Sequence, residues 1–220
     1  MNNRNRQRSV LFDLDGTLLD TAPDLAHALN FVLQENARDP LPLERIRRVV
    51  SHGGRALIEL GFGPEHDTPD LESLRQQLLA YYQQHLSEHT RLFPGMEIVL
   101  ETLASREIPW GIVTNKPGWL TEPLLRQMQL FGQAACIISG DSLPERKPHP
   151  APLLHASTLM GIRPESCLYV GDAERDIEAG RRAGMTTLAA LYGYLLEEDR
   201  PETWRADGCI RAPEELLDWL

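Results

Sequence analysis

The stretch Ser9-Val-Leu-Phe-Asp-Leu-Asp-Gly-Thr17 decides the fold class of this chain. Its first half is short and continuously apolar, which is typical of a strand buried on both faces of a parallel sheet. Two aspartates and a glycine follow at once, so polar side chains stand where the strand ends. Ligands of open parallel sheets bind beyond the carboxyl ends of the strands. The stretch therefore predicts a buried central strand with a binding site at its end.

Further along the chain, apolar runs of strand length alternate with helical patterns. The expected strands are 110–114, 135–139, 167–171 and 186–190, and the expected helices are 95–106, 120–130, 150–159 and 174–183. Alternation of this kind predicts right-handed crossovers and an α/β fold, a Rossmann-like parallel sheet covered by helices on both faces. Residues 208–210 are expected to add a short edge strand before a last helix at 213–220.

The connection between the first two strands, residues 14–109, is anomalously long for a crossover, which needs roughly 30 residues. Within it, Pro23 opens a helix whose apolar residues share one face, and further helical patterns follow without a strand. We therefore predict a helical cap at residues 20–90, inserted after the first strand and lying over the mouth of the sheet. Residues 1–19 and 91–220 are then the α/β core domain.

Composition limits the possible partners. The 220 residues carry 22 basic and 32 acidic side chains, a formal net charge of −10. A nucleic-acid surface normally needs a basic balance or a basic stripe, so we expect no nucleic-acid partner. Because the net charge is negative, an anionic ligand is not attracted to the chain from a distance. A site for such a ligand must therefore supply local positive charge from a metal, a lysine or backbone N–H groups.

Cysteine usage and the N-terminus indicate the compartment. The three cysteines, Cys136, Cys167 and Cys209, are far apart and have no CxxC spacing, as is typical of a reducing environment. The polar start at residues 1–8 is followed by no apolar stretch of signal-peptide or membrane-spanning length. We expect a cytoplasmic protein without membrane contact; the oligomeric state is not indicated by the sequence.

Polar residues gather at the predicted carboxyl edge of the sheet. The first strand is followed by Asp13 and Asp15, and the second by Thr114. The fourth is followed by Asp172, with Asp176 close behind it, and Lys147 lies in the loop between the third and fourth. Carboxylates, a hydroxyl and an ammonium group that meet at one edge indicate phosphoryl transfer.

The chemistry assigns roles to three of the carboxylates. A phosphate monoester is a dianion, so attack by an aspartate requires a divalent cation and fixed donors. Mg²⁺ prefers carboxylate oxygens and water, and Asp13 and Asp172 are the candidate side-chain ligands. Asp13 is the expected nucleophile, which would form an aspartyl phosphate. Asp15 is placed to protonate the leaving alcohol and then to deprotonate the attacking water.

Four motifs resemble those of the haloacid dehalogenase superfamily: Asp13-Leu-Asp-Gly-Thr17, the strand that ends in Thr114, Lys147 before Pro148, and Gly171-Asp-Ala-Glu-Arg-Asp176. The resemblance spans nearly the whole chain, and the helical insert looks like the family's helical cap. It implies a hydrolase acting on a small phosphate ester with Mg²⁺. It also implies that the Asp15 carbonyl binds the metal with Asp172 while Asp176 supports it, and that Thr114 and Lys147 bind the phosphoryl oxygens.

A finer resemblance lies outside the catalytic loops. The segments Trp110–Pro117, Arg91–Gly95 and Tyr192–Tyr194, together with Trp204, look like the phosphoglycolate phosphatase group. Among these, they are similar to the N-acetylmuramic acid 6-phosphate phosphatases of bacterial cell-wall recycling. Such likeness records ancestry as readily as substrate. The resemblance thus implies a carboxylated phosphomonoester, either 2-phosphoglycolate or N-acetylmuramic acid 6-phosphate.

Three residues beside the motifs receive weaker roles. Arg55, next to Gly53 and Gly54, is the predicted cap reader of a substrate carboxylate, because glycines let the backbone approach a ligand and Arg binds carboxylates. Asn115 is a candidate phosphate ligand, although it also fits a loop-shaping role. We interpret Lys116 as a solvated neighbour.

Other functions use part of this residue set. A sugar phosphomutase of the same superfamily shares all the core motifs and differs in the group that accepts phosphate. A phospho-accepting signalling module also uses Asp, Thr, Lys and Mg²⁺ on a parallel sheet, but Asp15 and a cap have no use there. Dinucleotide binding is disfavoured because no G-x-G-x-x-G follows the first strand.

Overall fold

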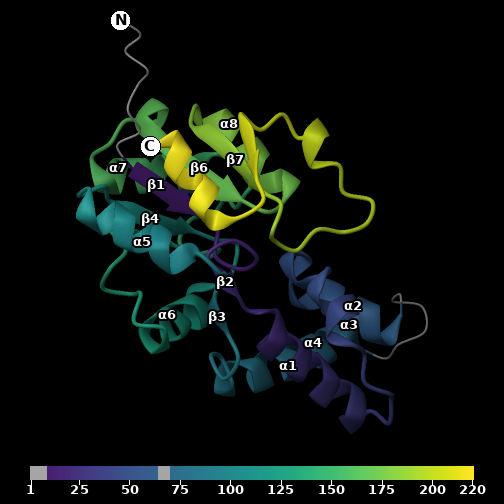
Figure 1. Cartoon of the computed structure of the whole chain (residues 1–220). Helices are drawn as coiled ribbons and strands as arrows, with labels where there is room; N and C mark the ends of the chain where they lie inside the picture. The colour runs from purple at the N-terminus through teal and green to yellow at the C-terminus, as the bar shows by residue number, and fades with distance from the viewer. Residues whose placement is uncertain (1–8, 64–69) are drawn as a thin grey trace, which may run out of the picture.

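The structure, a computed structural model, describes residues 9–63 and 70–220. A six-stranded sheet in the order β5-β4-β1-β6-β7-β8 forms its centre, and all its strand pairs are parallel (Figure 1). The strands in chain order are β1 (Ser9–Phe12), β4 (Trp110–Val113), β5 (Cys136–Ile138), β6 (Cys167–Gly171), β7 (Thr186–Ala190) and β8 (Gly208–Ile210). The predicted α/β fold with a parallel, Rossmann-like sheet is confirmed.

Helices cover both faces of this sheet, because side chains of a strand point alternately to its two sides. Val10 and Phe12 pack with α5 (Met96–Ser105), α6 (Gly118–Gln127) and the 3-10 helix η5 (Pro213–Trp219). Leu11 and Tyr169 pack on the other face with α7 (Ala151–Met160) and α8 (Glu174–Ala183). Two short 3-10 helices, η3 (Pro164–Ser166) and η4 (Pro201–Thr203), complete the connections.

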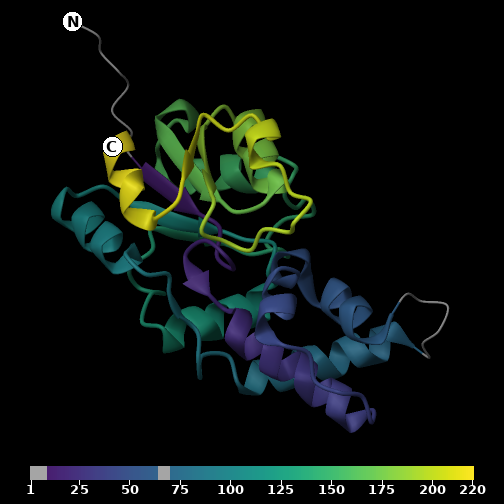
Figure 2. The same cartoon turned by 45° about the vertical axis from the view of Figure 1, so that its right-hand side comes forward.

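In its described residues, the long connection after β1 contains helices and, near the two ends of the insert, two short strands. Its elements are α1 (Ala22–Glu35), α2 (Leu43–Arg47), the 3-10 helix η1 (Val50–His52), α3 (Gly53–Phe62) and α4 (Leu71–Gln84). The chain leaves the core through β2 (Leu19–Asp20) and returns through β3 (Arg91–Leu92), and these strands pair antiparallel. Figures 1 and 2 show the four α-helices gathered on one side of the sheet, beyond the end of β1.

Local sequence predicts most of these elements but not all. The helix at 174–183 has the expected bounds, and the edge strand at 208–210 is present. The last helix forms, as a 3-10 helix. The pair β2–β3 was not predicted, since two-residue strands carry no periodicity. The assignments of residues 1–8 to the core and 64–69 to the cap lie outside the described residues.

Among the described residues, no helix combines the length and the apolar character that crossing a bilayer requires.

Candidate active site

The three central strands bring distant residues together. Because β1 lies between β4 and β6, the residues that follow these strands meet at one edge of the sheet. The ladders continue one residue further: the Asp13 N–H donates to the Val170 carbonyl at 2.9 Å, and the Thr114 N–H donates to the Ile138 carbonyl at 2.9 Å. The backbone of both polar residues is therefore fixed by the sheet itself.

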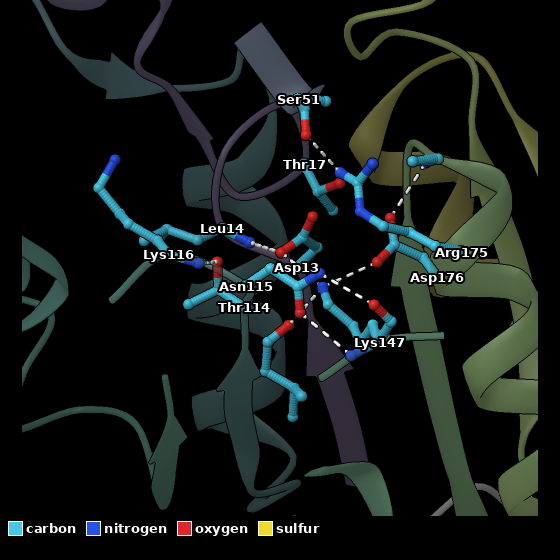
Figure 3. A network of polar contacts seen from close by, with 12 residues as sticks. Asp13, Leu14, Thr17, Ser51, Thr114, Asn115, Lys116, Lys147, Arg175 and Asp176 are labelled. Atoms are coloured by element: carbon cyan, nitrogen blue, oxygen red, sulfur yellow. Dashed lines mark hydrogen bonds and ion pairs between the residues drawn. The ribbon is translucent and has the colours of Figure 1, made fainter. Parts of the chain in front are cut away.

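Lys147 joins two of the predicted carboxylates. Its Nζ lies 2.8 Å from Asp13 Oδ1 and 2.7 Å from Asp176 Oδ1, and its side chain is 1% exposed. The ammonium also donates to the Val113 carbonyl at 2.8 Å and to the Tyr169 hydroxyl at 2.9 Å. Figure 3 shows Lys147 between Asp13 and Asp176. The lysine thus supplies local positive charge directly beside the predicted nucleophile.

The carboxylates of Asp13, Asp172 and Asp176 form one buried cluster, with an oxygen of each within 4.8 Å of the others. Burial and the neighbouring carboxylates raise the pKa of Asp172 to about 7. Burial, opposed by Lys147, raises the pKa of Asp13 to about 6. The pKa of Asp176 is lowered: burial acts to raise it, but Lys147 and Arg175 outweigh that effect.

This charge pattern fits a divalent cation. Three carboxylates face two cationic groups, Lys147 and Arg175, so the buried cluster keeps an excess of negative charge when all three carboxylates are ionised. A cation among hard carboxylate oxygens would remove the repulsion that raises the pKa of Asp172. The donor set, oxygen only, suits Mg²⁺ better than a thiolate-seeking metal.

Asp172 is held by donors from three parts of the chain. Thr17 Oγ1 donates to it at 3.3 Å, Ser51 Oγ at 2.9 Å and the Tyr194 N–H at 2.9 Å. Gly16, at φ +86°, lies so close that a Cβ there would overlap the Asp172 carboxylate. The turn after β1 therefore needs glycine both for its left-handed backbone and for this approach.

Asp15 lies in the turn after β1 and is partly exposed, at 17% of its side chain. It accepts hydrogen bonds from Thr21 Oγ1 at 2.6 Å and from Lys116 Nζ at 2.9 Å. The interpretation of Lys116 as a solvated neighbour is wrong, since its side chain is 6% exposed and its ammonium also donates to the Tyr82 hydroxyl at 3.0 Å. Burial acts to lower the pKa of Lys116, but Asp15 and Tyr82 raise it overall.

The Asn115 side chain is engaged with Lys147. Its Nδ2 donates to the Lys147 carbonyl at 3.0 Å, and its Oδ1 accepts from the Lys147 N–H at 3.1 Å. This reciprocal pair ties the loop after β4 to the loop that carries the lysine. Asn115 also lines the cavity described next, so its predicted contact with phosphate stays a prediction.

A cavity of about 940 Å³ opens between the sheet edge and the helical insert. Polar residues of the core that line it are Asp13, Asp15, Thr114, Asn115, Lys116, Asp141, Arg146 and Arg175. Polar residues of the insert that line it are Ser51, His52, Arg75, Gln76, Tyr82 and Gln83. Reactive groups of the core and side chains of the insert therefore face the same space.

The predicted cap reader does not line this cavity. Arg55 lies on α3, where its Nε is 2.8 Å from Glu59 Oε1 one turn further on, and its side chain is 64% exposed. Three other arginines, Arg75, Arg146 and Arg175, belong to the lining instead. Sequence reasoning missed all three, although Arg175 stands inside the motif that contains Asp172 and Asp176. Its Nη2 donates to the Ser51 carbonyl at 2.7 Å, which joins core and insert.

Comparison with known proteins identifies the class of reaction. A phosphoglycolate phosphatase of Xanthomonas campestris pv. campestris is 44% identical over 211 residues, which cover 96% of this chain and 95% of that protein. An N-acetylmuramic acid 6-phosphate phosphatase of Pseudomonas aeruginosa is 40% identical over 217 residues, which cover 99% and 96%. At such identities over nearly whole chains the reaction class is shared, and this chain is a phosphoric monoester hydrolase.

Solved structures and a family model agree with the relatives. A crystal structure from Haemophilus somnus, described as a predicted phosphoglycolate phosphatase, superposes with a TM-score of 0.84 at 26% identity and covers 99% of both chains. The model of the haloacid dehalogenase-like hydrolases matches residues 10–190, which include all four motifs. This chain therefore belongs to the haloacid dehalogenase-like hydrolase family.

Proposed function

We propose that this chain is a Mg²⁺-dependent phosphatase that hydrolyses a small carboxylated phosphomonoester through an aspartyl phosphate on Asp13. The two candidate esters, 2-phosphoglycolate and N-acetylmuramic acid 6-phosphate, come from the names of the relatives. One observation carries the proposal: Asp13 lines the cavity while its Oδ1 is held by the Leu14 N–H and by Lys147. Among the described residues no hydrogen bond is found on Asp13 Oδ2, the oxygen left to attack.

The cation would be held by the Asp13 and Asp172 carboxylates and the Asp15 main-chain carbonyl, with Asp176 as support. The fit rests on the oxygen-only donor set, and the pKa values of Asp13 and Asp172, which are raised by burial and by neighbouring carboxylates, agree with it. When bound, Mg²⁺ supplies electrostatic shielding between the carboxylate and the phosphate dianion. All remaining steps are carried by side chains of this chain.

In the first step, Asp13 Oδ2 forms a bond to phosphorus while the bond from phosphorus to the ester oxygen breaks. The departing alkoxide takes a proton from Asp15, which thereby becomes a carboxylate. Thr114 and Lys147 stabilise the phosphoryl oxygens, and Lys147 is already charged and fixed before substrate arrives. Preorganised charge costs no reorganisation during the reaction.

In the second step, a water molecule attacks the phosphorus of the aspartyl phosphate and gives a proton to Asp15. The bond between phosphorus and Asp13 Oδ2 breaks, which releases inorganic phosphate and restores both aspartates to their starting states. The position of Asp15 in the turn beyond β1, next to the cavity, suits this exchange of protons. Asp13 thus acts as the nucleophile, while the neighbouring Asp15 acts as the general acid and then as the general base.

Residues 20–90 are proposed to act as a cap that selects the ester, since the core motifs contact only the phosphoryl group. Both candidate esters carry a carboxylate, which an arginine binds well. Arg55 is paired with Glu59 and lies outside the lining of the cavity, whereas Arg75, which is paired with Glu72, belongs to the lining. Arg55→Gln and Arg75→Gln therefore separate the two: the variant of the true reader raises KM for the carboxylated ester and leaves p-nitrophenyl phosphate unaffected.

The test is a panel of phosphate esters, with and without Mg²⁺, that includes both candidates. We expect release of inorganic phosphate from one of them, dependence on Mg²⁺, and loss of activity in Asp13→Asn with an unchanged circular dichroism spectrum. Acid-quenched enzyme incubated with labelled ester should retain the label on Asp13. Full activity of Asp13→Asn would end the aspartyl-phosphate proposal, and an isomerised sugar phosphate in place of inorganic phosphate would indicate a mutase.

A further inference from the structure

Lysine occurs only twice in this chain, at positions 116 and 147; the remaining basic side chains are arginine. Both lysines are buried at the site and each pairs with a different aspartate. Lys147 contacts Asp13 and Asp176, as described above. Lys116 contacts Asp15 instead, at 2.9 Å. In Figure 3 the Lys116 side chain runs away from Asp13 and Lys147, so the two ammonium groups serve separate carboxylates.

The backbone around Lys116 is fixed on both sides. Its N–H donates to Thr114 Oγ1 at 3.1 Å, and its carbonyl accepts from the Gly140 N–H at 2.8 Å and from Thr121 Oγ1 at 3.2 Å. A Cβ on Gly140 would overlap the carbonyl of Asn115, so this close approach needs glycine. The lysine side chain therefore starts from an anchored point and reaches Asp15 from a set direction.

The third partner belongs to the helical insert. Tyr82 lies on α4 and is fully buried, its hydroxyl is 3.0 Å from Lys116 Nζ, and the ammonium also sits 4.6 Å from the centre of its ring. A buried ammonium is costly unless it is paired, and here one partner comes from the core and the other from the insert. The lowest-energy position of Lys116 thus depends on where α4 lies.

We propose that Lys116 is a positioning residue that orients Asp15 for proton transfer, and that Tyr82 makes this orientation depend on the helical insert being in place. The inference rests on the proposed function, in which Asp15 protonates the leaving alcohol. Thr21 Oγ1, which donates to the same oxygen of Asp15 at 2.6 Å, completes the support of that carboxylate. Proton transfer becomes efficient only when the cap is docked over the core.

The dependence of kcat/KM on the leaving group distinguishes a role of Lys116 in proton transfer from a merely structural role. An alkoxide needs a proton to depart, whereas p-nitrophenolate is a weak base that leaves without one. We compare kcat/KM for the hydrolysed alkyl ester, 2-phosphoglycolate or N-acetylmuramic acid 6-phosphate, with kcat/KM for p-nitrophenyl phosphate. Because general acid catalysis contributes about 10²–10⁴-fold, Lys116→Met is expected to lose about 10–100-fold on the alkyl ester and less than about threefold on p-nitrophenyl phosphate.

Matched variants complete the design. Lys116→Arg restores a cation and should recover part of the alkyl-ester rate, and Tyr82→Phe should show a smaller loss with the same leaving-group bias. Arg163→Met removes an exposed cation, 76% exposed, on the loop before β6 and should change neither rate. Lys147→Met should lower both rates alike, since Lys147 serves Asp13. Equal losses on the two esters in Lys116→Met would overturn the inference.

A spectroscopic measurement tests the contact without turnover. With lysine labelled at Nζ by ¹⁵N, the chain gives only two ammonium signals, since it has only two lysines. Tyr82→Phe should shift the Lys116 signal and leave the Lys147 signal in place. A shift of neither signal would overturn the proposed coupling. Wild-type protein that hydrolyses neither ester with Mg²⁺ would overturn the proposed function instead, and this outcome is recognised before any variant is made.

Discussion

At the scale of single residues, the compensation of buried charge determines how the site is built. Lys147 is 1% exposed and has two carboxylates within 2.8 Å, so its removal leaves Asp13 and Asp176 buried without their main partner. A buried charge that loses its partner is far more costly than the pair itself is stabilising. The residues of this cluster therefore depend on each other for folding as well as for chemistry.

Lys147→Met is expected to lower the free energy of unfolding by about 3–5 kcal/mol, because two buried carboxylates lose their cation. The double variant Lys147→Met/Asp176→Asn should regain part of that loss while remaining inactive, since one of the stranded charges is gone. Urea unfolding monitored by fluorescence measures both values. If the single variant were as stable as the wild type, the charge balance described for this cluster would be incorrect.

Sequence reasoning finds residues that belong to a local motif, but it misses residues whose role depends on a contact with a residue far away in the sequence. Asp13, Asp15, Asp172 and Asp176 follow strands in recognisable order, so they could be placed from sequence. Lys116 could not, because Tyr82 and Asp15 are far from it along the chain, although the rarity of lysine was a signal. Its sequence neighbours gave no sign that its side chain would be buried.

At the scale of elements, the buried strands were predictable because each is short, apolar and followed by a helix. The pairing of β2 with β3 was not predictable, because each strand has only two residues and the whole insert separates them in the sequence. The prediction of Arg55 as the reader of the substrate carboxylate shows the same limit of reasoning from local sequence. Arg55 was predicted because neighbouring glycines let the backbone approach a ligand, but Gly53 and Gly54 instead begin α3, whose helical spacing brings Arg55 to Glu59.

The two ends of the insert are joined by a buried carboxylate on its first helix. Asp24, 1% exposed near the start of α1, accepts hydrogen bonds from the His89 N–H at 2.9 Å, the Thr90 N–H at 2.8 Å and the Thr90 hydroxyl at 2.7 Å. The departing and returning segments are thereby joined just outside β2 and β3. Three donors would be left without this acceptor if the carboxylate were removed.

Asp24→Ala is therefore expected to lower the free energy of unfolding by about 2–4 kcal/mol, since buried donors left unsatisfied each cost about 1–3 kcal/mol. Asp24→Asn keeps one acceptor oxygen and should lose less. Hydrogen exchange of the Thr90 amide, compared with amides of β1, shows whether the loss begins at this junction. Equal protection of Thr90 in wild type and Asp24→Ala would contradict the role of Asp24 in joining the two ends of the insert.

At the scale of the whole molecule, a chain with a negative net charge gathers several basic side chains around one cavity. The net charge is −10, yet Lys116, Arg75, Arg146 and Arg175 line one cavity, and Lys147 lies beside Asp13. The net charge predicted that a site for an anionic ligand would need local positive charge, and basic residues of both the core and the insert supply it. One apolar cluster also runs from the sheet into the insert, from Val10 to Ile58, which gives the insert a packed contact with the core.

The same cluster of acids makes the stability of the metal-free protein depend on pH. The pKa of Asp13 is raised to about 6 and that of Asp172 to about 7, both from an ordinary value of 3.8. Between about pH 4 and pH 7 the folded state therefore binds more protons than the unfolded state, so the free energy of unfolding falls as the pH rises through this window. The lowered pKa of Asp176 acts below pH 4, where it favours unfolding as the pH falls.

A divalent cation should reverse this loss, because it stabilises the ionised carboxylates of the folded state and hence the folded state itself. We expect Mg²⁺ at about 10 mM to raise the Tm of wild-type protein more at pH 8 than at pH 5. Protein freed of metal with EDTA should have a lower Tm at pH 8 than at pH 5.

In Asp172→Asn both the pH dependence of the Tm and the effect of Mg²⁺ on the Tm should become smaller, since one of the two carboxylates with a raised pKa is gone. Differential scanning calorimetry at matched ionic strength measures all of these values, with Mg²⁺-free buffer as the reference. An effect of Mg²⁺ that is equal at the two pH values, or equal in wild type and Asp172→Asn, would show that the ion binds elsewhere.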